Sequence, residues 1–178
     1  NTISLNNYRF VFSRGKNYIQ DSFILALIAT PLTAFTGMII SYLVIRKNFI
    51  GKRFIEFASM LTFAVPGIVL GIGYIIAFNK PPLLLTGTAT ILILALMFRN
   101  MSIGIEAGTN GLRQIDPSIE EASTVQGAST TYTFWHITLP LIKSAIYTTM
   151  VNAFVRSMTS ISAVIFLVSV YWNLLTVM

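Results

Sequence analysis

Residues 116–140 read DPSIEEASTVQGASTTYTFWHITLP, and this stretch decides how the rest of the chain is interpreted. It holds three of the six acidic residues and the only histidine, and apolar runs crowd both sides of it. It belongs to the longest part of the chain that no predicted membrane-spanning segment occupies. A polar segment of this length between two spans predicts a structured docking surface, which the remaining chain is expected to hold in place.

The apolar composition of the chain predicts a membrane protein. Of its 178 residues, 54% are hydrophobic and 10% are charged. Soluble domains carry about 25% charged residues, and a helix needs about 20 apolar residues to cross a bilayer. We therefore expect an all-α, polytopic transmembrane helical bundle in contact with lipid, with about four spans. Because the basic residues flank apolar runs, the net charge of +6 indicates topology and headgroup contact, and no nucleic-acid partner.

The order of apolar and charged runs gives the predicted organisation. Residues 1–21 mix aromatic and basic side chains and are expected to form an outer segment. A cytoplasmic coupling region is predicted over 101–140, and spans are predicted over 22–45, 54–78, 83–99 and 141–170. The loop RKNFIGKR (46–53) has four basic residues in eight positions, which marks the cytoplasmic side. The chain starts with Asn1 and ends just after an apolar run, so we expect part of a longer protein.

Proline and glycine interrupt two of the predicted spans. Pro31 lies near the middle of 22–45 and is expected to kink that helix. Pro66 and Gly67 make 54–78 breakable near its middle, either as a packing kink or as a hinge beside a transport pathway; Pro31, Pro66 and Gly67 are the candidate hinge residues. Small residues at helical spacing after Pro31 predict a close helix–helix contact: Ala34, Gly37 and Ser41.

Local signals predict two short helices within the stretch from which we started. Asp116 is a good N-cap, and Pro117 suits the first helical position. Gly127 is placed to end the first helix in a left-handed conformation. Ser129 can cap the second helix, and Pro140 is expected to open the last span. The result would be a hairpin of two helices that is anchored at both ends.

The first of these helices is expected to be amphipathic. Glu120 and Glu121 lie in its first two turns, where the helix dipole favours carboxylates. Its apolar face follows at spacings of four, three and three residues: Ile115, Ile119, Ala122 and Val125.

The fixed residues of the hairpin resemble a known motif. Glu121-Ala122-Ser123, three residues, Gly127, nine residues and Ile137-Thr138-Leu139-Pro140 match the EAA loop of binding-protein-dependent ATP-binding cassette (ABC) importer permeases. That loop is written E-A-A, three residues, G, nine residues, I-x-L-P, and only its second alanine differs here. Residues 63–79, 112–123 and 154–167 also resemble the ferric iron branch of these permeases, whose close relatives move phosphonates, polyamines or thiamine.

The resemblance implies a MetI-like core and one half of a multi-pass permease of the bacterial cytoplasmic (inner) membrane. It implies coupling helices that dock on cytoplasmic ABC ATPase subunits, which would bind ATP and Mg²⁺, since this sequence has no GxxxxGK[ST] motif. The permease itself would be no enzyme and would bind no cofactor. Further implied partners are a second permease half, in the same chain or another, and an extracytoplasmic substrate-binding protein. The implied coupling residues are Glu121, Ala122, Ser123, Gly127, Ile137, Leu139 and Pro140.

Polar residues in the last apolar run predict a translocation pathway. An arginine within a span is a functional candidate by default, and Arg156 lies well inside 141–170. The alternative is a structural arginine that pairs with Glu56 or Glu106, or that reaches an interface. A positive charge there suits an anion or an iron–anion complex better than bare Fe³⁺. The candidate pathway residues are Asn152, Arg156, Ser157, Thr159 and Ser160.

The function that the resemblance implies is that of an ATP-driven importer permease, with ferric iron as the expected substrate. His136 has no partner at ligand spacing, so a packed or exposed hairpin residue is favoured over a metal ligand, and no high-affinity metal site is predicted. One alternative is an importer permease for another solute, such as a phosphonate, polyamine or thiamine. The others are a channel or a membrane enzyme, but an enzyme needs converging acid–base or metal groups, which the spans do not offer.

Overall fold

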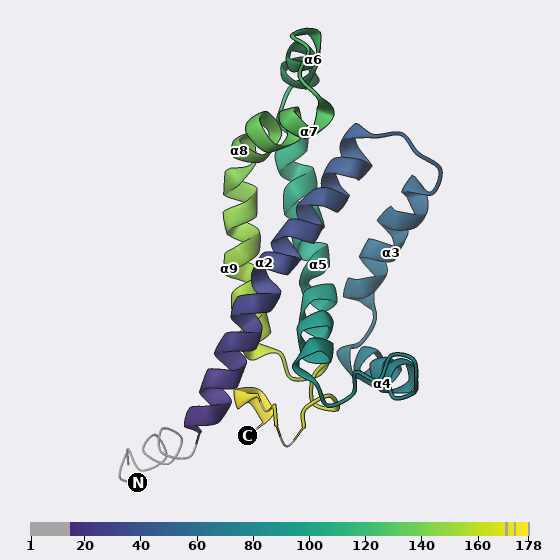
Figure 1. Cartoon of the computed structure of the whole chain (residues 1–178), viewed down its shortest axis with the longest axis vertical. Helices are drawn as coiled ribbons and strands as arrows, with labels where there is room; N and C mark the ends of the chain where they lie inside the picture. Colours follow the sequence, from purple (N-terminus) through teal and green to yellow (C-terminus); the bar gives the residue numbers. More distant parts are fainter. Residues whose placement is uncertain (1–14, 170, 173, 178) are drawn as a thin grey trace. The chain divides into compact units, whose positions relative to one another are not determined.

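The computed structural model describes residues 15–169, 171–172 and 174–177, and the regular structure in this part is helical (Figure 1). The expected all-α fold class is confirmed. The elements in chain order are α2 (Lys16–Arg46), α3 (Lys52–Ala64), α4 (Gly67–Phe78), α5 (Ala89–Arg113), α6 (Pro117–Val125), α7 (Thr130–Thr133), the π-helix η1 (Phe134–Thr138), α8 (Leu139–Leu141), α9 (Lys143–Thr159) and the 3₁₀-helix η2 (Leu175–Val177).

The chain divides into two compact units, and each is described by itself. The first contains Val65–Arg99, Phe154–Met178 and the residues up to Thr30. The second contains Pro31–Ala64 and Asn100–Ala153. Helices α2, α5 and α9 each contribute residues to both units. The hairpin 116–140 lies wholly in the second unit.

The first unit has an aliphatic core from parts of the chain that are distant in sequence. Leu25 of α2, Leu92 and Leu96 of α5, and Leu167 after α9 are all fully buried in it or nearly so. Helix α4 approaches the segment after α9 closely, because a Cβ at Gly71 would lie 2.8 Å from the Ala163 carbonyl oxygen. Only glycine permits that approach.

In the second unit, α2 and α5 touch through their backbones. A Cβ at Gly37 would lie 2.8 Å from the Gly104 Cα, and a Cβ at Gly108 would collide with the Ser41 side chain. Residues Gly37 and Ser41 thus make the close helix–helix contact that their spacing predicted. Glycines in α5 let its C-terminal half pack tightly on its neighbours, and this half leads directly into the hairpin.

Two helices in the described part of the chain are long and apolar enough to cross a membrane by length and composition, Lys16–Arg46 and Ala89–Arg113. Gly67–Phe78 is apolar but shorter. The helix of the predicted span 83–99 starts at Ala89 and continues through residues 101–113. Of the outer segment predicted over 1–21, residues 1–14 lie outside the described residues, and Lys16–Asp21 belong to α2.

Two predicted helices differ from those in the structure. The helix expected over 54–78 is interrupted at Val65 and Pro66, because Pro66 has no N–H to donate and disfavours a helical residue before it. The helix expected over 141–170 ends at Thr159, and turns follow although the sequence stays apolar. An apolar composition shows that a segment can leave water, but it does not specify the backbone hydrogen bonds of a helix. Pro31, in contrast, lies inside an uninterrupted α2.

Candidate functional site

The first arm of the hairpin is the helix α6, which begins as its local sequence predicts. Asp116 is the N-cap, and its carboxylate accepts a hydrogen bond of 2.9 Å from the Ser118 backbone N–H. Pro117 takes the first helical position, where no N–H is needed. Hydrogen bonds from the Ser118 backbone N–H and then from the Ser118 side chain lower the pKa of Asp116 below its ordinary value, and the nearby Arg46 charge adds a smaller effect. The cap therefore works with an ionised carboxylate.

The turn of the hairpin is built on Gly127. Its φ is +85°, the left-handed region that the sequence predicted for this position. The Gly127 N–H donates to the Thr124 carbonyl at 2.9 Å, and the Ala128 N–H donates to the Ser123 carbonyl at 3.1 Å. These bonds satisfy carbonyls at the end of α6 and reverse the chain into the second arm.

The second arm starts at Ser129, whose hydroxyl accepts from the Tyr132 N–H at 3.2 Å, as predicted for a cap. After α7 the helix widens into the π-helix η1, just before Pro140, which has no N–H for a regular helix bond. Pro140 was expected to open the last span, but it lies in α8, and Ile142 separates it from α9.

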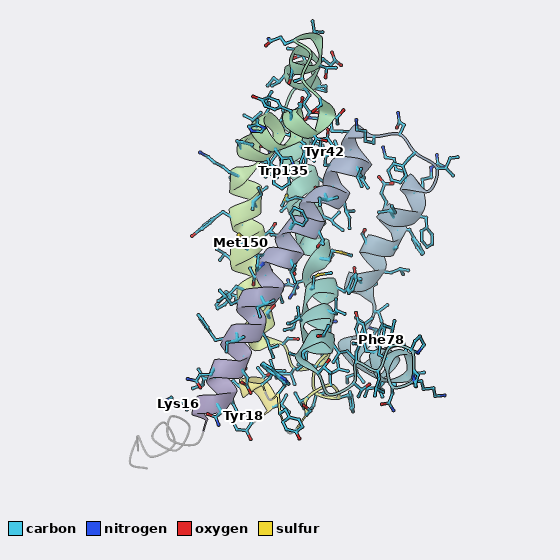
Figure 2. All side chains as sticks on the ribbon, in the orientation of Figure 1. Lys16, Tyr18, Tyr42, Phe78, Trp135 and Met150 are labelled. Atoms are coloured by element: carbon cyan, nitrogen blue, oxygen red, sulfur yellow. The ribbon has the colours of Figure 1, made fainter. Side chains whose placement is uncertain are left out.

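The two arms are joined by a buried pair of hydroxyls, and aromatic rings join the second arm to α2. Ser123 Oγ and Thr133 Oγ1 lie 2.9 Å apart. The Phe134 ring meets the Tyr42 ring edge-to-face at a centroid distance of 4.7 Å. Trp135 stacks on Phe35 of α2 at 6.2 Å (Tyr42 and Trp135 are labelled in Figure 2). The hydroxyl pair thus holds the arms together, and the aromatic contacts hold the hairpin against α2.

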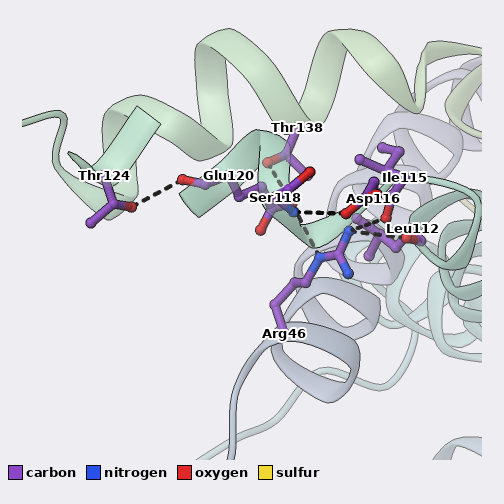
Figure 3. A network of polar contacts seen from close by, with 8 residues as sticks. All are labelled: Arg46, Leu112, Ile115, Asp116, Ser118, Glu120, Thr124 and Thr138. Carbon is purple, nitrogen blue, oxygen red and sulfur yellow. Dashed lines mark hydrogen bonds and ion pairs between the residues drawn. The ribbon is translucent and has the colours of Figure 1, made fainter. Parts of the chain in front are cut away.

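A polar network connects the hairpin to α2 and to the end of α5 (Figure 3). Arg46 Nε donates to Glu120 Oε1 at 3.1 Å, and its Nη2 donates to the carbonyls of Leu112 at 3.1 Å and Ile115 at 3.0 Å. The Thr138 hydroxyl donates to the same Glu120 oxygen at 3.1 Å. The side chains of Arg46 and Glu120 are only 12% and 14% exposed. One carboxylate therefore binds both α2 and the second arm of the hairpin.

Three of the four residues of the predicted apolar face lie at the surface of the hairpin, whereas Ile115, which precedes α6, is half-buried and packs against the cluster that contains Leu112. Val125 is 88% exposed and Ile119 is 43% exposed, and Ala122 and Glu121 beside them are also exposed. An exposed apolar patch with a carboxylate next to it is typical of a protein–protein docking surface. Ile119, Ala122 and Val125 follow at spacings of three residues and therefore form an exposed apolar stripe with Glu121 beside it.

The residues predicted for ATPase coupling differ in their exposure. Glu121, Ala122, Gly127 and Pro140 are exposed, and Ile137 and Leu139 are half-buried. Ser123 is buried against the second arm, so it is a packing residue of the hairpin and offers no contact to a partner. The hairpin thus brings most of the set to its surface.

The predicted pathway residues do not share one face of α9. Asn152, Arg156 and Thr159 are exposed and follow at spacings of four and three residues, which puts them on one side of the helix. Ser157 is buried, and Ser160 lies after the end of the helix and accepts from the Thr176 hydroxyl through its carbonyl. Only the exposed three form a polar stripe.

The predicted hinge residues lie at the boundaries of the two units. One boundary falls between Thr30 and Pro31, and another falls between Ala64 and Val65, just before Pro66 and Gly67.

His136 is exposed, stacks on the Tyr132 ring at 4.1 Å and has its Nδ1 3.1 Å from the Tyr132 carbonyl oxygen. It is therefore a surface residue packed within its own arm.

Sequence reasoning missed Arg46, Glu120 and Thr138 as a group. In the sequence, Arg46 belongs to the basic loop, and Glu120 lies where a helix dipole favours a carboxylate. Arg46 and Glu120 are 74 positions apart, so no local pattern indicates that they meet. The one available signal was the presence of two adjacent acids at a helix start, which must point in different directions.

Comparison with known proteins finds a matching family and several relatives of this chain. Residues 29–171 match the family model described as binding-protein-dependent transport system inner membrane component. The ferric transport system permease protein FbpB of Actinobacillus pleuropneumoniae is 44% identical over 94% of this chain, and FbpB 1 of Haemophilus influenzae is 46% identical over 94%. The probable sulfate transport system permease protein cysT of Chlorokybus atmophyticus is 32% identical over 81% of this chain and 54% of its own length.

The chain spans 25% of the Actinobacillus relative and 27% of the Haemophilus relative. The family match, in contrast, covers most of the chain and includes α5, the hairpin and α9. By this match, the chain belongs to the family of inner membrane components of binding-protein-dependent transport systems.

Proposed function

We propose that this chain is part of the permease subunit of an ATP-driven importer, and that its hairpin docks on a partner ATPase. The surface of α6 carries the proposal, because an exposed apolar face beside the exposed Glu121 needs a partner to cover it. The family match supports the transport role. The ATPase would bind and hydrolyse ATP, the hairpin would carry its movement to the helices, and the permease would not be catalytic itself.

Ferric iron is the proposed substrate. Two relatives with more than 40% identity over 94% of this chain carry the name of a ferric transport system permease protein. An extracytoplasmic binding protein would deliver the iron, and a second permease half would complete the pathway. The hairpin would face the cytoplasm, with the basic residues after α2 on the same side of the membrane.

An anion importer is the second candidate. The exposed side of α9 carries Asn152, Arg156 and Thr159, and a guanidinium attracts oxyanions. The sulfate-type relative at 32% identity also favours this candidate. Uptake of radioactive Fe³⁺ and of sulfate, phosphonate, polyamine and thiamine probes by vesicles that hold the complete importer separates these substrates.

The docking role is tested with Val125→Glu in the full-length permease, expressed with its ATPase. Because Val125 is almost fully exposed, the added charge should leave folding unchanged but should abolish co-purification of the ATPase. Gln126→Glu is the matched control, since it adds the same charge one position further on and keeps the apolar face intact. Undiminished co-purification with Val125→Glu contradicts the proposal.

A further inference from the structure

Glu120 and Glu121 are neighbours in sequence but have opposite surroundings. The Glu120 side chain is 14% exposed and accepts hydrogen bonds from Arg46 and Thr138, whereas Glu121 is exposed. Consecutive residues of a helix point about 100° apart, so one acid faces the unit and the other faces outward. Only Glu121 is free to meet a partner, and Glu120 has a different task.

Arg46 joins three helix ends. It is the last residue of α2, and its Nε donates to Glu120 in the first turn of α6. Its Nη2 donates to the Leu112 carbonyl near the end of α5 and to the Ile115 carbonyl just after that helix. The planar guanidinium suits this arrangement, because it presents several donors in fixed directions, which a lysine cannot do. The positive charge also complements the negative end of the α5 dipole.

The chain itself connects the hairpin to α5 and α9 but not to α2. Residue Arg113 ends α5 three residues before Asp116 caps α6, and Ile142 alone separates α8 from α9. In contrast, Arg46, the residue of α2 that contacts Glu120, lies 74 positions before it in the sequence. Movement of the hairpin can therefore reach α2 only through non-covalent contacts. Among these, hydrogen bonds of a mostly buried ion pair resist sliding, whereas stacked rings can shift past one another.

We propose that Arg46 and Glu120 are positioning residues that make α2 move together with the hairpin when the partner ATPase changes state. The proposal rests on the proposed function and adds a division of labour between the two acids. Glu121 meets the ATPase, while Glu120, through Arg46 and Thr138, holds both arms of the hairpin against α2 and α5.

The test uses the complete importer, with permease, ATPase and binding protein, in proteoliposomes. Variants Glu120→Ala and Arg46→Met remove the link, Glu120→Gln and Arg46→Lys keep part of it, and Lys47→Met is the charge-matched control at an exposed neighbour. The readouts are ATPase co-purification, ATP hydrolysis and uptake of radioactive Fe³⁺ delivered by the binding protein. We expect co-purification and ATP hydrolysis to persist, while uptake per ATP falls about tenfold in Glu120→Ala.

The conservative variants should recover part of the uptake, and the double variant Arg46→Met with Glu120→Ala should be no worse than either single change. If Glu120→Ala does not reach the membrane, Glu120→Gln takes its place with a fall of about threefold. Uptake per ATP equal to that of the unaltered importer overturns the proposal. Failure of the proposed function has a different signature, since the unaltered permease would then retain no ATPase.

A second readout does not depend on transport. The 178 residues contain no cysteine, so spin labels can be placed at Leu43→Cys on α2 and Gln126→Cys at the end of α6. In the unaltered network, the mean distance between the labels should be the same with and without ATP, and the distribution of distances should be narrow in both states. In Glu120→Ala, the distribution of distances should broaden or its mean should shift when ATP is added. An ATP-independent distance in both proteins overturns the inference.

Discussion

The hydroxyls of Ser123 and Thr133 lie 2.9 Å apart in a buried contact between the two arms of the hairpin. Ser123 stands at the one position where the sequence departs from the E-A-A pattern. The position faces the second arm, so a small residue is required, and a serine fits there because a hydroxyl on the facing helix can pair with it. The departure from the pattern is thus accommodated by a hydrogen bond.

Replacement of Ser123 by alanine should be mild. Thr133 Oγ1 keeps its bond to the Ser129 carbonyl at 3.2 Å, so no buried hydroxyl is left alone, and the expected loss of unfolding free energy is at most about 1 kcal/mol. Ser123→Leu should lose about 1–3 kcal/mol, because the larger side chain must separate the arms. Thermal unfolding in detergent measures both. Equal losses in the two variants would contradict this account.

Gly127 should tolerate substitutions in an order set by its backbone. Its φ is +85°, and a Cβ there would meet nothing within 4 Å, so the penalty comes from conformation alone. Gly127→Ala should lose about 1–2 kcal/mol, Gly127→Asn less, and Gly127→Val more, because β-branched residues avoid the left-handed region. Unfolding of the three variants should show this order. A valine variant as stable as the asparagine variant would disprove it.

The caps of the hairpin were predictable because their signals are local. Asp116, Gly127 and Ser129 act on residues within four positions, and both the types and the spacing of these residues identify their roles. The link between Arg46 and Glu120 depends on how α2, α5 and the hairpin pack, and nothing near either residue records it. Local chemistry therefore revealed the shape of the hairpin but not its attachment to the rest of the unit.

The helix ends in the apolar runs were harder to predict. Hydropathy reports whether a segment can leave water, and it does not distinguish helix from turns, so the end of α9 at Thr159 was missed within 141–170. Pro66 did indicate a weak point in 54–78, yet composition could not show that the helix stops there. Both errors have the same origin, which is that apolar side chains alone do not specify backbone hydrogen bonding.

The contact between Gly37 and Gly104 should be sensitive to a single methyl group. A Cβ at Gly37 would lie 2.8 Å from backbone atoms of Gly104, which cannot rotate away, so Gly37→Ala should lose about 1–3 kcal/mol of unfolding free energy. Gly73→Ala in α4 is the matched control, since a Cβ there meets nothing within 4 Å. That control should gain about 0.5–1 kcal/mol from helix propensity. A loss of similar size in both variants would show that the close approach is unimportant.

Asp116 should make the stability of the hairpin depend on pH in the acid range. Its pKa is lowered from 3.8, mainly by the Ser118 backbone N–H, so the fold favours the charged carboxylate. The stabilisation is therefore fully present above the ordinary pKa and is lost as the pH falls through the lower pKa of the folded state. Asp116→Asn keeps a capping oxygen without the charge, and Asp116→Ala removes both.

Thermal unfolding of these three proteins across the acid range checks this account. The unaltered protein should lose stability relative to Asp116→Asn as the pH falls below about 4, and Asp116→Ala should be the least stable at neutral pH. The difference between the unaltered protein and the asparagine variant isolates the carboxylate, because other acids titrate equally in both. If that difference does not change with pH, the carboxylate makes no charge-dependent contribution to the cap. In that case, the asparagine variant would differ from the unaltered protein by the same amount from neutral pH down into the acid range.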